Sequence, residues 1–250
     1  MTNVLASSTG AALHVEATHS FLYLALALSL IAPVLLTAVL RPALRRKIAR
    51  MALYGAVWGP FAEYWYTRDY WHPIGVFGNA WLEDTLYGAG FFALSSVAPD
   101  LVSHRRLRGI QRASHRKAFL ALPLAYAVSM VLFSVVAGWN SIIVACAFGT
   151  AAVALMLARR RDLRSRCLTA ALSMLAVAVL VYSIGLDAYR PGARLLPKIW
   201  LLDGQPLGVR VLGNIPLTEL VFYLVWGGAV GIFYEYAYGF HVTVDTAPSP

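Results

Sequence analysis

Long apolar runs separated by short polar stretches dominate the pattern along this chain of 250 residues. A bilayer core of about 30 Å is crossed by about 20 apolar residues in a helix, and seven runs reach or approach that length. The pattern therefore predicts seven transmembrane helices, at 20–40, 51–67, 81–98, 119–137, 140–158, 168–187 and 216–238. The second run is the weakest, because Pro60 and Glu63 interrupt it.

The composition indicates a polytopic membrane protein of the all-α class. Hydrophobic residues make up 59% of the chain and charged residues only 13%, which excludes an ordinary soluble domain. We expect the segments 1–19 and 239–250 to be tails outside the helices. No basic segment precedes the first apolar run at Phe21, so a cleaved signal peptide is not expected.

Positive charge is concentrated in three of the predicted loops. Most of the 21 lysines and arginines lie in 41–50, 103–117 and 158–167. Basic loops stay on the cytoplasmic side of a membrane, so the N-terminus is predicted outside and the C-terminus inside. This arrangement requires an odd number of spans and thereby supports the weak second helix. The expected location is the cytoplasmic membrane of a bacterium.

The chain contains a weak internal repeat. Residues 78–87 align without gaps to residues 213–222, and each copy opens a predicted helix that carries a carboxylate in its first turn. The alignment predicts two three-helix repeats, 20–98 and 140–238, joined by a basic loop and a linking helix at 99–139. Both repeats start outside, so a parallel pseudo-twofold axis would relate them, and a shared site would lie on that axis.

Acidic side chains inside a bilayer are costly and are candidates for function by default. Five lie within or at the ends of predicted spans: Glu63, Glu83, Asp84, Asp187 and Glu219. An alternative for those at helix starts is that they only complement the positive end of the helix dipole. Asp187, at the C-terminal end of its span, would gain nothing from that dipole.

Aromatic side chains follow two of these acids at helical spacing. Positions three, four and seven after Glu219 are Phe222, Tyr223 and Trp226, and positions four and eight after Glu83 are Tyr87 and Phe91. A neutral carboxyl group can protonate an alkene, and aromatic faces stabilise the resulting cation. The spacing therefore favours chemistry through a carbocation.

Two further features concern orientation. Asp84 points about 100° away from Glu83 on the same helix, so at most one of the two faces the axis. A second aromatic group, at the outer boundary, is more typical of an interfacial belt than of a pocket lining. Its members are Trp65, Tyr66, Tyr70, Trp71 and Trp81.

Several other classes of protein lack their required residues here. The last span contains no lysine for a retinal Schiff base, and the histidines lie outside the spans, unlike those of membrane iron enzymes. Prenyltransferases hold Mg²⁺ and diphosphate with cytoplasmic acids, whereas these acids are on the other side. Neither a flavin bound through a glycine-rich fingerprint nor a Mg²⁺ site is expected. The basic loops fit lipid headgroups better than nucleic acid.

The segment from Ile215 to Tyr223 resembles a motif of the lycopene cyclase domain family, which usually has Pro, two acids and Phe-Phe. Here Pro216 and Glu219 keep the pattern, and Thr218 replaces one acid. In the first copy Glu83 and Asp84 keep both acids, and the stretch 63–73 resembles the family's aromatic loop ending in Pro. The family includes heterodimeric and fused lycopene cyclases, and relatives among membrane terpene cyclases.

The resemblance implies protonation of a terminal alkene, ring closure and proton loss, without net redox change, in carotenoid or other isoprenoid biosynthesis. The reaction would be independent of a cofactor or assisted by flavin. The substrate would be a lipophilic isoprenoid drawn from membrane lipid. Glu219 and one of Glu83 and Asp84 are the predicted acid and base, with Glu63 and Asp187 orienting them. The alternatives are a small-molecule or proton-coupled transporter and a non-catalytic assembly subunit.

Overall fold

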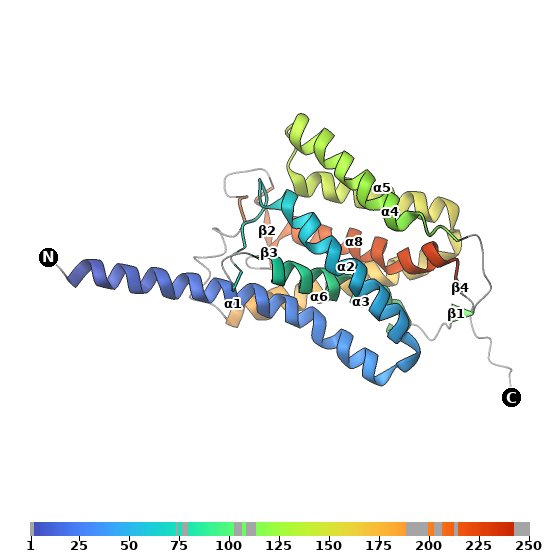
Figure 1. Cartoon of the computed structure of the whole chain (residues 1–250), viewed down its shortest axis with the longest axis horizontal. Coiled ribbons are helices and arrows are strands. Elements are labelled where there is room, and N and C mark those ends of the chain that lie inside the picture. Colours follow the sequence, from blue (N-terminus) through green and yellow to red (C-terminus); the bar gives the residue numbers. More distant parts are fainter. Residues whose placement is uncertain are drawn as a thin grey trace.

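The computed structural model describes residues 3–73, 75–76, 80–102, 107–108, 114–188, 200–202, 207–212 and 215–242, with side chains for all of these except 3–20, 107–108, 185–188 and 241–242. Seven α-helices lie in this part of the chain and form one bundle (Figure 1). They are α1 (Asn3–Leu40), α2 (Arg45–Tyr66), α3 (Trp81–Val102), α4 (Ala118–Ser129), α5 (Ser141–Arg159), α6 (Arg164–Ala188) and α8 (Leu217–Tyr238). The all-α prediction is confirmed.

Some helices extend beyond the predicted spans. Most of the predicted N-terminal tail at 1–19 is helical, because α1 already begins at Asn3. That segment contains no proline and several alanines, so nothing in it ends a helix. The N-terminal part of α1 projects away from the bundle (Figure 1). At the other end of the bundle α2 starts at Arg45, inside the basic segment 41–50.

Five of the described helical segments are long and apolar enough to cross a membrane by length and composition. They are Phe21–Leu40, Ala118–Val136, Ser141–Arg159, Arg161–Ile184 and Leu217–Tyr238. By this criterion the chain is an integral membrane protein. Helices α2 and α3 are not among the five, although each has 22 residues.

Helices α3 and α8 occupy the centre of the bundle and pack against each other. Helix α3 also contacts α1, α2 and α6, while α8 contacts α5 and α6. Glycine allows the closest approach in each half, since a Cβ atom at Gly59 would lie 2.0 Å from the Asp84 carbonyl oxygen and one at Gly231 would lie 2.1 Å from the Ala170 Cβ. These contacts fix the rotation of α3 and α8 and hence the direction of their side chains.

Helix α4 lies at the periphery beside α5 (Figure 1). It continues into a π-helical stretch, Met130–Val136, so that the two together match the predicted linking helix. Only Tyr126, Met130 and Ser134 are buried along its length. The exposed residues are mostly apolar, as expected for a helix that faces lipid.

Two short antiparallel strand pairs close opposite ends of the bundle. Strands β2 (Arg210–Val211) and β3 (Ile215–Pro216) pair directly before α8, while β1 (Leu107–Arg108) pairs with β4 (His241–Val242) after it. A separate bridge joins Trp71 to Trp200 beside the start of α8. The segments before α3 and α8 are therefore tied to each other.

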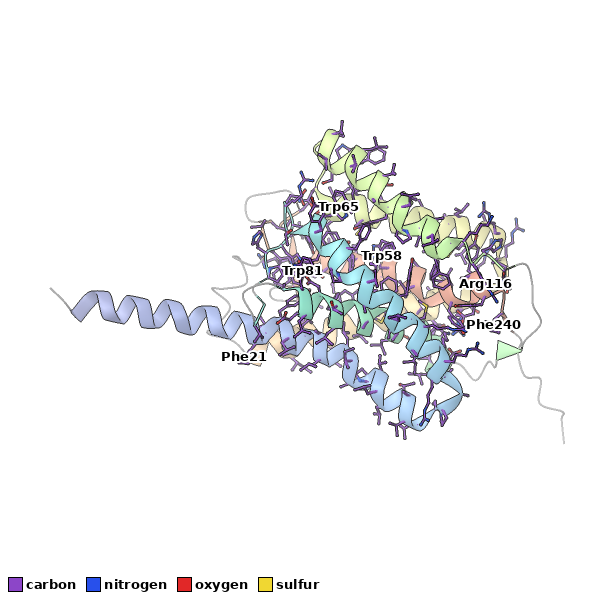
Figure 2. The ribbon with its side chains drawn as sticks, in the orientation of Figure 1. Phe21, Trp58, Trp65, Trp81, Arg116 and Phe240 are labelled. Carbon is purple, nitrogen blue, oxygen red and sulfur yellow. The ribbon has the colours of Figure 1, made fainter. Side chains whose placement is uncertain are left out.

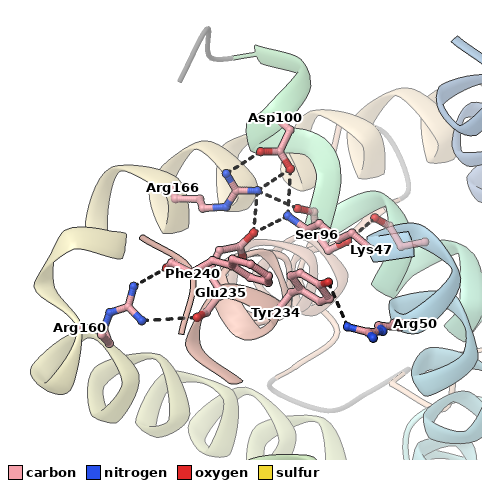
Figure 3. A network of polar contacts seen from close by, with 10 residues as sticks. Lys47, Arg50, Ser96, Asp100, Arg160, Arg166, Tyr234, Glu235 and Phe240 are labelled. Atoms are coloured by element: carbon pink, nitrogen blue, oxygen red, sulfur yellow. Dashed lines mark hydrogen bonds and ion pairs between the residues drawn. The ribbon is translucent and has the colours of Figure 1, made fainter. Parts of the chain in front are cut away.

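Four buried charges form a closed set at the arginine-rich end, which we call the ionic ring: Lys47, Asp100, Arg166 and Glu235 (Figure 3). Lys47 Nζ lies 2.9 Å from Asp100 and 2.5 Å from Glu235. Arg166 binds Asp100 through two nitrogens, at 2.6 and 2.8 Å, and reaches Glu235 at 3.2 Å. Each cation thus contacts both acids, and the charges balance. No side chain in the ring is more than 8% exposed.

The two halves share a local feature at the same end. Helix α1 leads through a 3-10 turn, Pro42–Leu44, into α2, and α5 leads through the 3-10 turn Arg161–Leu163 into α6. The residues before these turns have nearly equal backbone angles, with φ −128° and ψ 72° at Arg41 and φ −135° and ψ 74° at Arg160. The turns place Lys47 and Arg166 at equivalent positions in the following helices.

Candidate active site

A small chamber lies at the end of the bundle opposite the ionic ring. Residues of α1, α2, α3, α5, α6 and α8 line it, and its volume is about 60 Å³. The lining includes three carboxyl groups, those of Glu63, Asp84 and Glu219, among many aromatic rings. Acids from three helices therefore line the same chamber.

Glu219 is held by three donors from three separate segments. Its Oε1 atom accepts hydrogen bonds from the Tyr70 hydroxyl at 2.6 Å and from the Trp200 indole nitrogen at 3.0 Å. Its Oε2 atom accepts one from the Tyr182 hydroxyl at 3.0 Å. The carboxyl group is only 5% exposed, and it lies in the first turn of α8 directly after Pro216. An indole nitrogen can only donate, so this arrangement suits a carboxylate that accepts.

The bridge between Trp71 and Trp200 positions two of these donors. Next to it, the Leu201 backbone N–H donates to the Tyr70 carbonyl oxygen at 2.7 Å. Tyr70 follows α2, outside the predicted spans, and is fully buried. Burial raises the pKa of Tyr70, and the neighbouring Glu219 charge raises it further. Its hydroxyl therefore stays protonated and remains a hydrogen-bond donor.

Asp84 and Glu83 point in different directions. Asp84 lines the chamber and accepts a hydrogen bond from the Tyr23 hydroxyl of α1. Glu83 is not part of the lining, and it accepts a hydrogen bond from the Val76 backbone N–H at 2.8 Å. The helical geometry required that only one of the pair face the shared space, and here that residue is Asp84.

Of the other two predicted acids, the structure describes the side chain of Glu63 but not that of Asp187. Glu63 of α2 lines the chamber at 8% exposure, and its Oε1 atom has no hydrogen-bond partner among the described residues. Asp187 lies in the last turn of α6, but its side chain falls outside the described residues. Its predicted orienting role stays a prediction.

Four of the five predicted pocket aromatics line the chamber: Tyr87, Phe91, Phe222 and Trp226. Tyr223 lies behind them, fully buried, with its ring 5.2 Å from Phe91 and 6.0 Å from Tyr182. The stripes predicted on α3 and α8 thus meet across the interface between the two central helices.

The interpretation of the second aromatic group as an interfacial belt is wrong for three of its members. Tyr66, Tyr70 and Trp71 line the chamber and are at most 9% exposed. They turn inward because the end of α2 and the following turn pack over the open ends of the central helices. Trp81 is 73% exposed, as a belt residue would be, whereas Trp65 is 9% exposed and does not line the chamber.

Sequence reasoning missed several residues of the site. Tyr23 and Tyr182 lie alone in apolar spans, and Trp200 follows a segment with no recognisable pattern. The sequence contained one indication of Tyr182. When the two halves of the chain are aligned so that Pro42 matches Arg161, Tyr182 falls at the position of Glu63. Trp58, which also lines the chamber, lies near the middle of α2 (Figure 2).

The described residues contain no group of three or more His, Cys, Asp or Glu side chains placed to hold a metal ion. Two of the chamber acids, Asp84 and Glu219, instead accept hydrogen bonds from tyrosine and tryptophan side chains. The chamber therefore presents carboxyl groups, phenol hydroxyls and aromatic faces.

Together these features define a polytopic helical membrane protein with acids enclosed in an aromatic chamber. Residues 140–237 match the family model of lycopene cyclase. The second half of the chain is thus similar to a lycopene cyclase domain. The matched residues include α5, α6, Trp200 and nearly all of α8. The predicted resemblance is therefore confirmed over nearly the whole second half of the chain. No curated protein and no solved structure matches the chain.

Proposed function

We propose that the protein is an integral-membrane terpene cyclase that protonates an isoprenoid chain and closes a ring through a carbocation. The observation that carries this proposal is the shared chamber, in which Asp84 of α3 and Glu219 of α8 lie among aromatic rings. The proton taken up by the alkene equals the proton lost from the cyclised cation. The reaction therefore needs no electron donor or acceptor.

Glu219 is assigned as the proton acceptor. Three donors approach its two oxygens, and they stabilise a carboxylate more than a neutral acid. A carboxylate fixed in this way also stabilises a nearby positive charge by electrostatic attraction. It would remove the proton from the carbon next to the cyclised cation.

Asp84 is assigned as the proton donor, with Glu63 beside it in the chamber. Within the described chain Asp84 accepts from one side chain, Tyr23, and Glu63 Oε1 has no partner. Asp84 and Glu63 therefore each lack the three hydrogen-bond donors that favour the carboxylate at Glu219. Glu83 is not assigned this role, because it does not line the chamber and one of its oxygens accepts from the Val76 backbone N–H.

The size and lining of the chamber suit the reacting end of a chain. A buried water requires roughly 10–15 Å³ of such space, so about 60 Å³ holds about four to six atoms of that size. This is about the size of the terminal isoprene unit that takes up the proton, and the unit that closes the ring would need further space. Faces of Trp58, Phe91 and Trp226 would stabilise the cation, and exclusion of water would protect it.

The ionic ring argues against the transporter alternative. A carrier requires a polar route between both surfaces, whereas the aromatic contacts of Tyr54, Trp58 and Phe233 lie between the chamber and the ring. The balanced charges of the ring then close the arginine-rich end. The assembly-subunit alternative predicts acids that face loops or headgroups, and three acids face the chamber instead.

We further propose that α1–α3 and α5, α6 and α8 are repeats around a parallel pseudo-twofold axis. The separation between Asp84 and Glu219 equals that between Asp100 and Glu235. The number of residues between Lys47 and Arg166 likewise equals the number between the starts of the two 3-10 turns. With 22 residues, α2 and α3 would each be about 33 Å long and would complete seven spans. The basic loops would lie in the cytoplasm.

Expression in a host that accumulates lycopene, and in hosts that accumulate shorter isoprenoids, tests the proposed function. A cyclised product with the same mass as its precursor is expected in one of them. The Glu219→Gln variant should form little of it while reaching the membrane in normal amount. Cyclisation by that variant at the unmodified rate would remove Glu219 from the chemistry.

A further inference from the structure

A second and larger cavity lies outside the chamber, between α4, α5 and α8 at the arginine-rich end. Its volume is about 680 Å³. Small side chains create it, because Ala121 and Ala125 of α4 face Ala151 of α5 across the gap. These three alanines are exposed, so the groove opens to the surroundings of the bundle. We call it the alanine groove.

Cationic side chains gather at one end of the alanine groove. Arg116 and Lys117 precede α4, and Arg159 ends α5. Arg116 is labelled at that end of the bundle in Figure 2. None of the three has a carboxylate partner in the described part of the chain. By contrast Arg160, next to Arg159, is paired with Asp162.

Two tyrosines of α8, Tyr236 and Tyr238, contact two of these cations. The Tyr236 hydroxyl accepts a hydrogen bond from Arg159 Nη1 at 3.0 Å, and the His115 ring stacks on the Tyr236 ring at 4.5 Å. Tyr236 itself is only 4% exposed. The Arg116 guanidinium lies 5.5 Å from the centre of the Tyr238 ring. All three cations are exposed, and two of them, Arg116 and Arg159, are positioned by contacts with tyrosines of α8.

We propose that the alanine groove binds one anionic glycerophospholipid, with its phosphate on Arg116, Lys117 and Arg159 and an acyl chain against the alanines. Charge complementarity carries this assignment: fixed guanidinium groups match phosphate oxygens, and no described acid neutralises them. The apolar part continues directly from the charged end, as in a lipid that lies beside a helix. A bilayer supplies this ligand at the level where a basic loop meets headgroups.

One aromatic contact connects the groove with the chamber. Phe148 lines the groove and stacks on Trp226, which lines the chamber, with ring centres 6.2 Å apart. An acyl chain beside Phe148 would therefore support the chamber wall. The lipid proposal nevertheless stands without the cyclase proposal, because its test measures binding.

The test is native mass spectrometry of the full-length protein, purified and stripped of lipid in detergent. The probes are phosphatidylglycerol, phosphatidylcholine with the same acyl chains, and inorganic phosphate. The charge variant is Arg116→Gln with Lys117→Gln and Arg159→Gln. Its matched control changes three exposed arginines outside the groove: Arg46→Gln, Arg161→Gln and Arg164→Gln.

Phosphatidylglycerol should bind as a single equivalent, and the charge variant should bind it at least about tenfold more weakly. The control triple variant should bind within about twofold of the unmodified protein. Phosphatidylcholine should bind much more weakly, and millimolar inorganic phosphate should not displace the lipid. Displacement of the lipid by inorganic phosphate would overturn the proposal and show that the groove binds a free anion. An equal loss of phosphatidylglycerol binding in both triple variants would also overturn it, because binding would then reflect general attraction to the basic surface.

A second pair of variants tests the acyl chain without changing charge. Ala151→Phe fills the groove and should also weaken phosphatidylglycerol binding, while Ala154→Phe, on an exposed position of α5 outside the groove, should not. Melting temperature and gel filtration confirm that each variant folds as a single species. Unchanged binding by Ala151→Phe would overturn the proposed chain position. A stable dimer dissociated by the same variant would assign the groove to a second copy.

Discussion

The Trp200 indole nitrogen donates a hydrogen bond to Glu219 across 3.0 Å. Tyr70, from the first half of the bundle, donates to the same oxygen, and Tyr182, from the second half, donates to the other. The environment of Glu219 is therefore complete only when both halves are assembled. These three donors explain how an acid can be kept buried in the first turn of α8.

Asp84→Asn should lower turnover by about 100-fold or more, because removal of a positioned general acid costs about 10²–10⁴ in rate. The neighbouring Glu83→Gln is the matched control, since Glu83 accepts from the Val76 backbone and does not line the chamber. Its turnover should stay within a few-fold of the unmodified protein. Product formation per unit of membrane-inserted protein measures both. Equal losses in the two variants would contradict the assignment of Asp84 as the donor.

Tyr70→Phe and Trp200→Phe each remove one donor from Glu219. A hydrogen bond to a charged group contributes about 1.5–3 kcal/mol, so each variant should lose about tenfold or more in turnover. The effect should disappear in the Glu219→Gln background, because the donors act through the carboxylate. A double-mutant cycle on turnover measures this coupling. Full additivity of the losses would argue that these aromatic residues act independently of Glu219.

Lys47→Met should destabilise the protein by about 3–5 kcal/mol, because it leaves Asp100 and Glu235 with Arg166 as the remaining cation of the ring. Adding Glu235→Gln restores the charge balance and should recover part of the loss. Arg46→Met is the control, since Arg46 is exposed on the same helix. Thermal unfolding in detergent measures all three variants. No recovery in the double variant would contradict the view that charge balance stabilises the ring.

The ionic ring also predicts a dependence of stability on pH. Burial would raise the pKa of Asp100, which lies beyond the predicted span 81–98, but Lys47 and Arg166 outweigh burial and lower this pKa. Its contribution is therefore fully present above the unfolded pKa of about 3.9 and is lost as pH falls through the folded value. The melting temperatures of the protein and of Asp100→Asn should converge on acidification below pH about 4. A constant difference between them down to acidic pH would contradict this linkage.

The helices could be predicted from the sequence because long apolar runs leave few alternatives in a bilayer. Their ends were less predictable: the start of α1 at Asn3 depends on helix-forming residues that carry no span signal. The internal repeat and the acids within the predicted spans also indicated that the site lies at one end of α3 and α8. The match of residues 140–237 to lycopene cyclase agrees with the motif around Glu219.

The rest of the site depends on tertiary contacts. The choice of Asp84 over Glu83 depends on the rotation of α3, which the close approach at Gly59 fixes. Tyr23, Tyr182 and Trp200 come from segments with no periodic partner. Lys47 lies in a run of basic residues. No sequence pattern distinguishes this buried member of the ionic ring from the neighbouring residues that only orient the chain in the membrane.

Cyclisation in heavy water tests the central claim most directly. Protein reconstituted in vesicles would be supplied with the isoprenoid identified in the expression experiment, and the product would be analysed by mass spectrometry. One deuterium is expected for each ring formed, since a solvent-derived deuteron is added and a substrate proton is lost. Asp84→Asn should abolish the labelled product. A cyclised product without deuterium, or with a mass that indicates oxidation or reduction, would contradict the proposed proton transfer in the chamber.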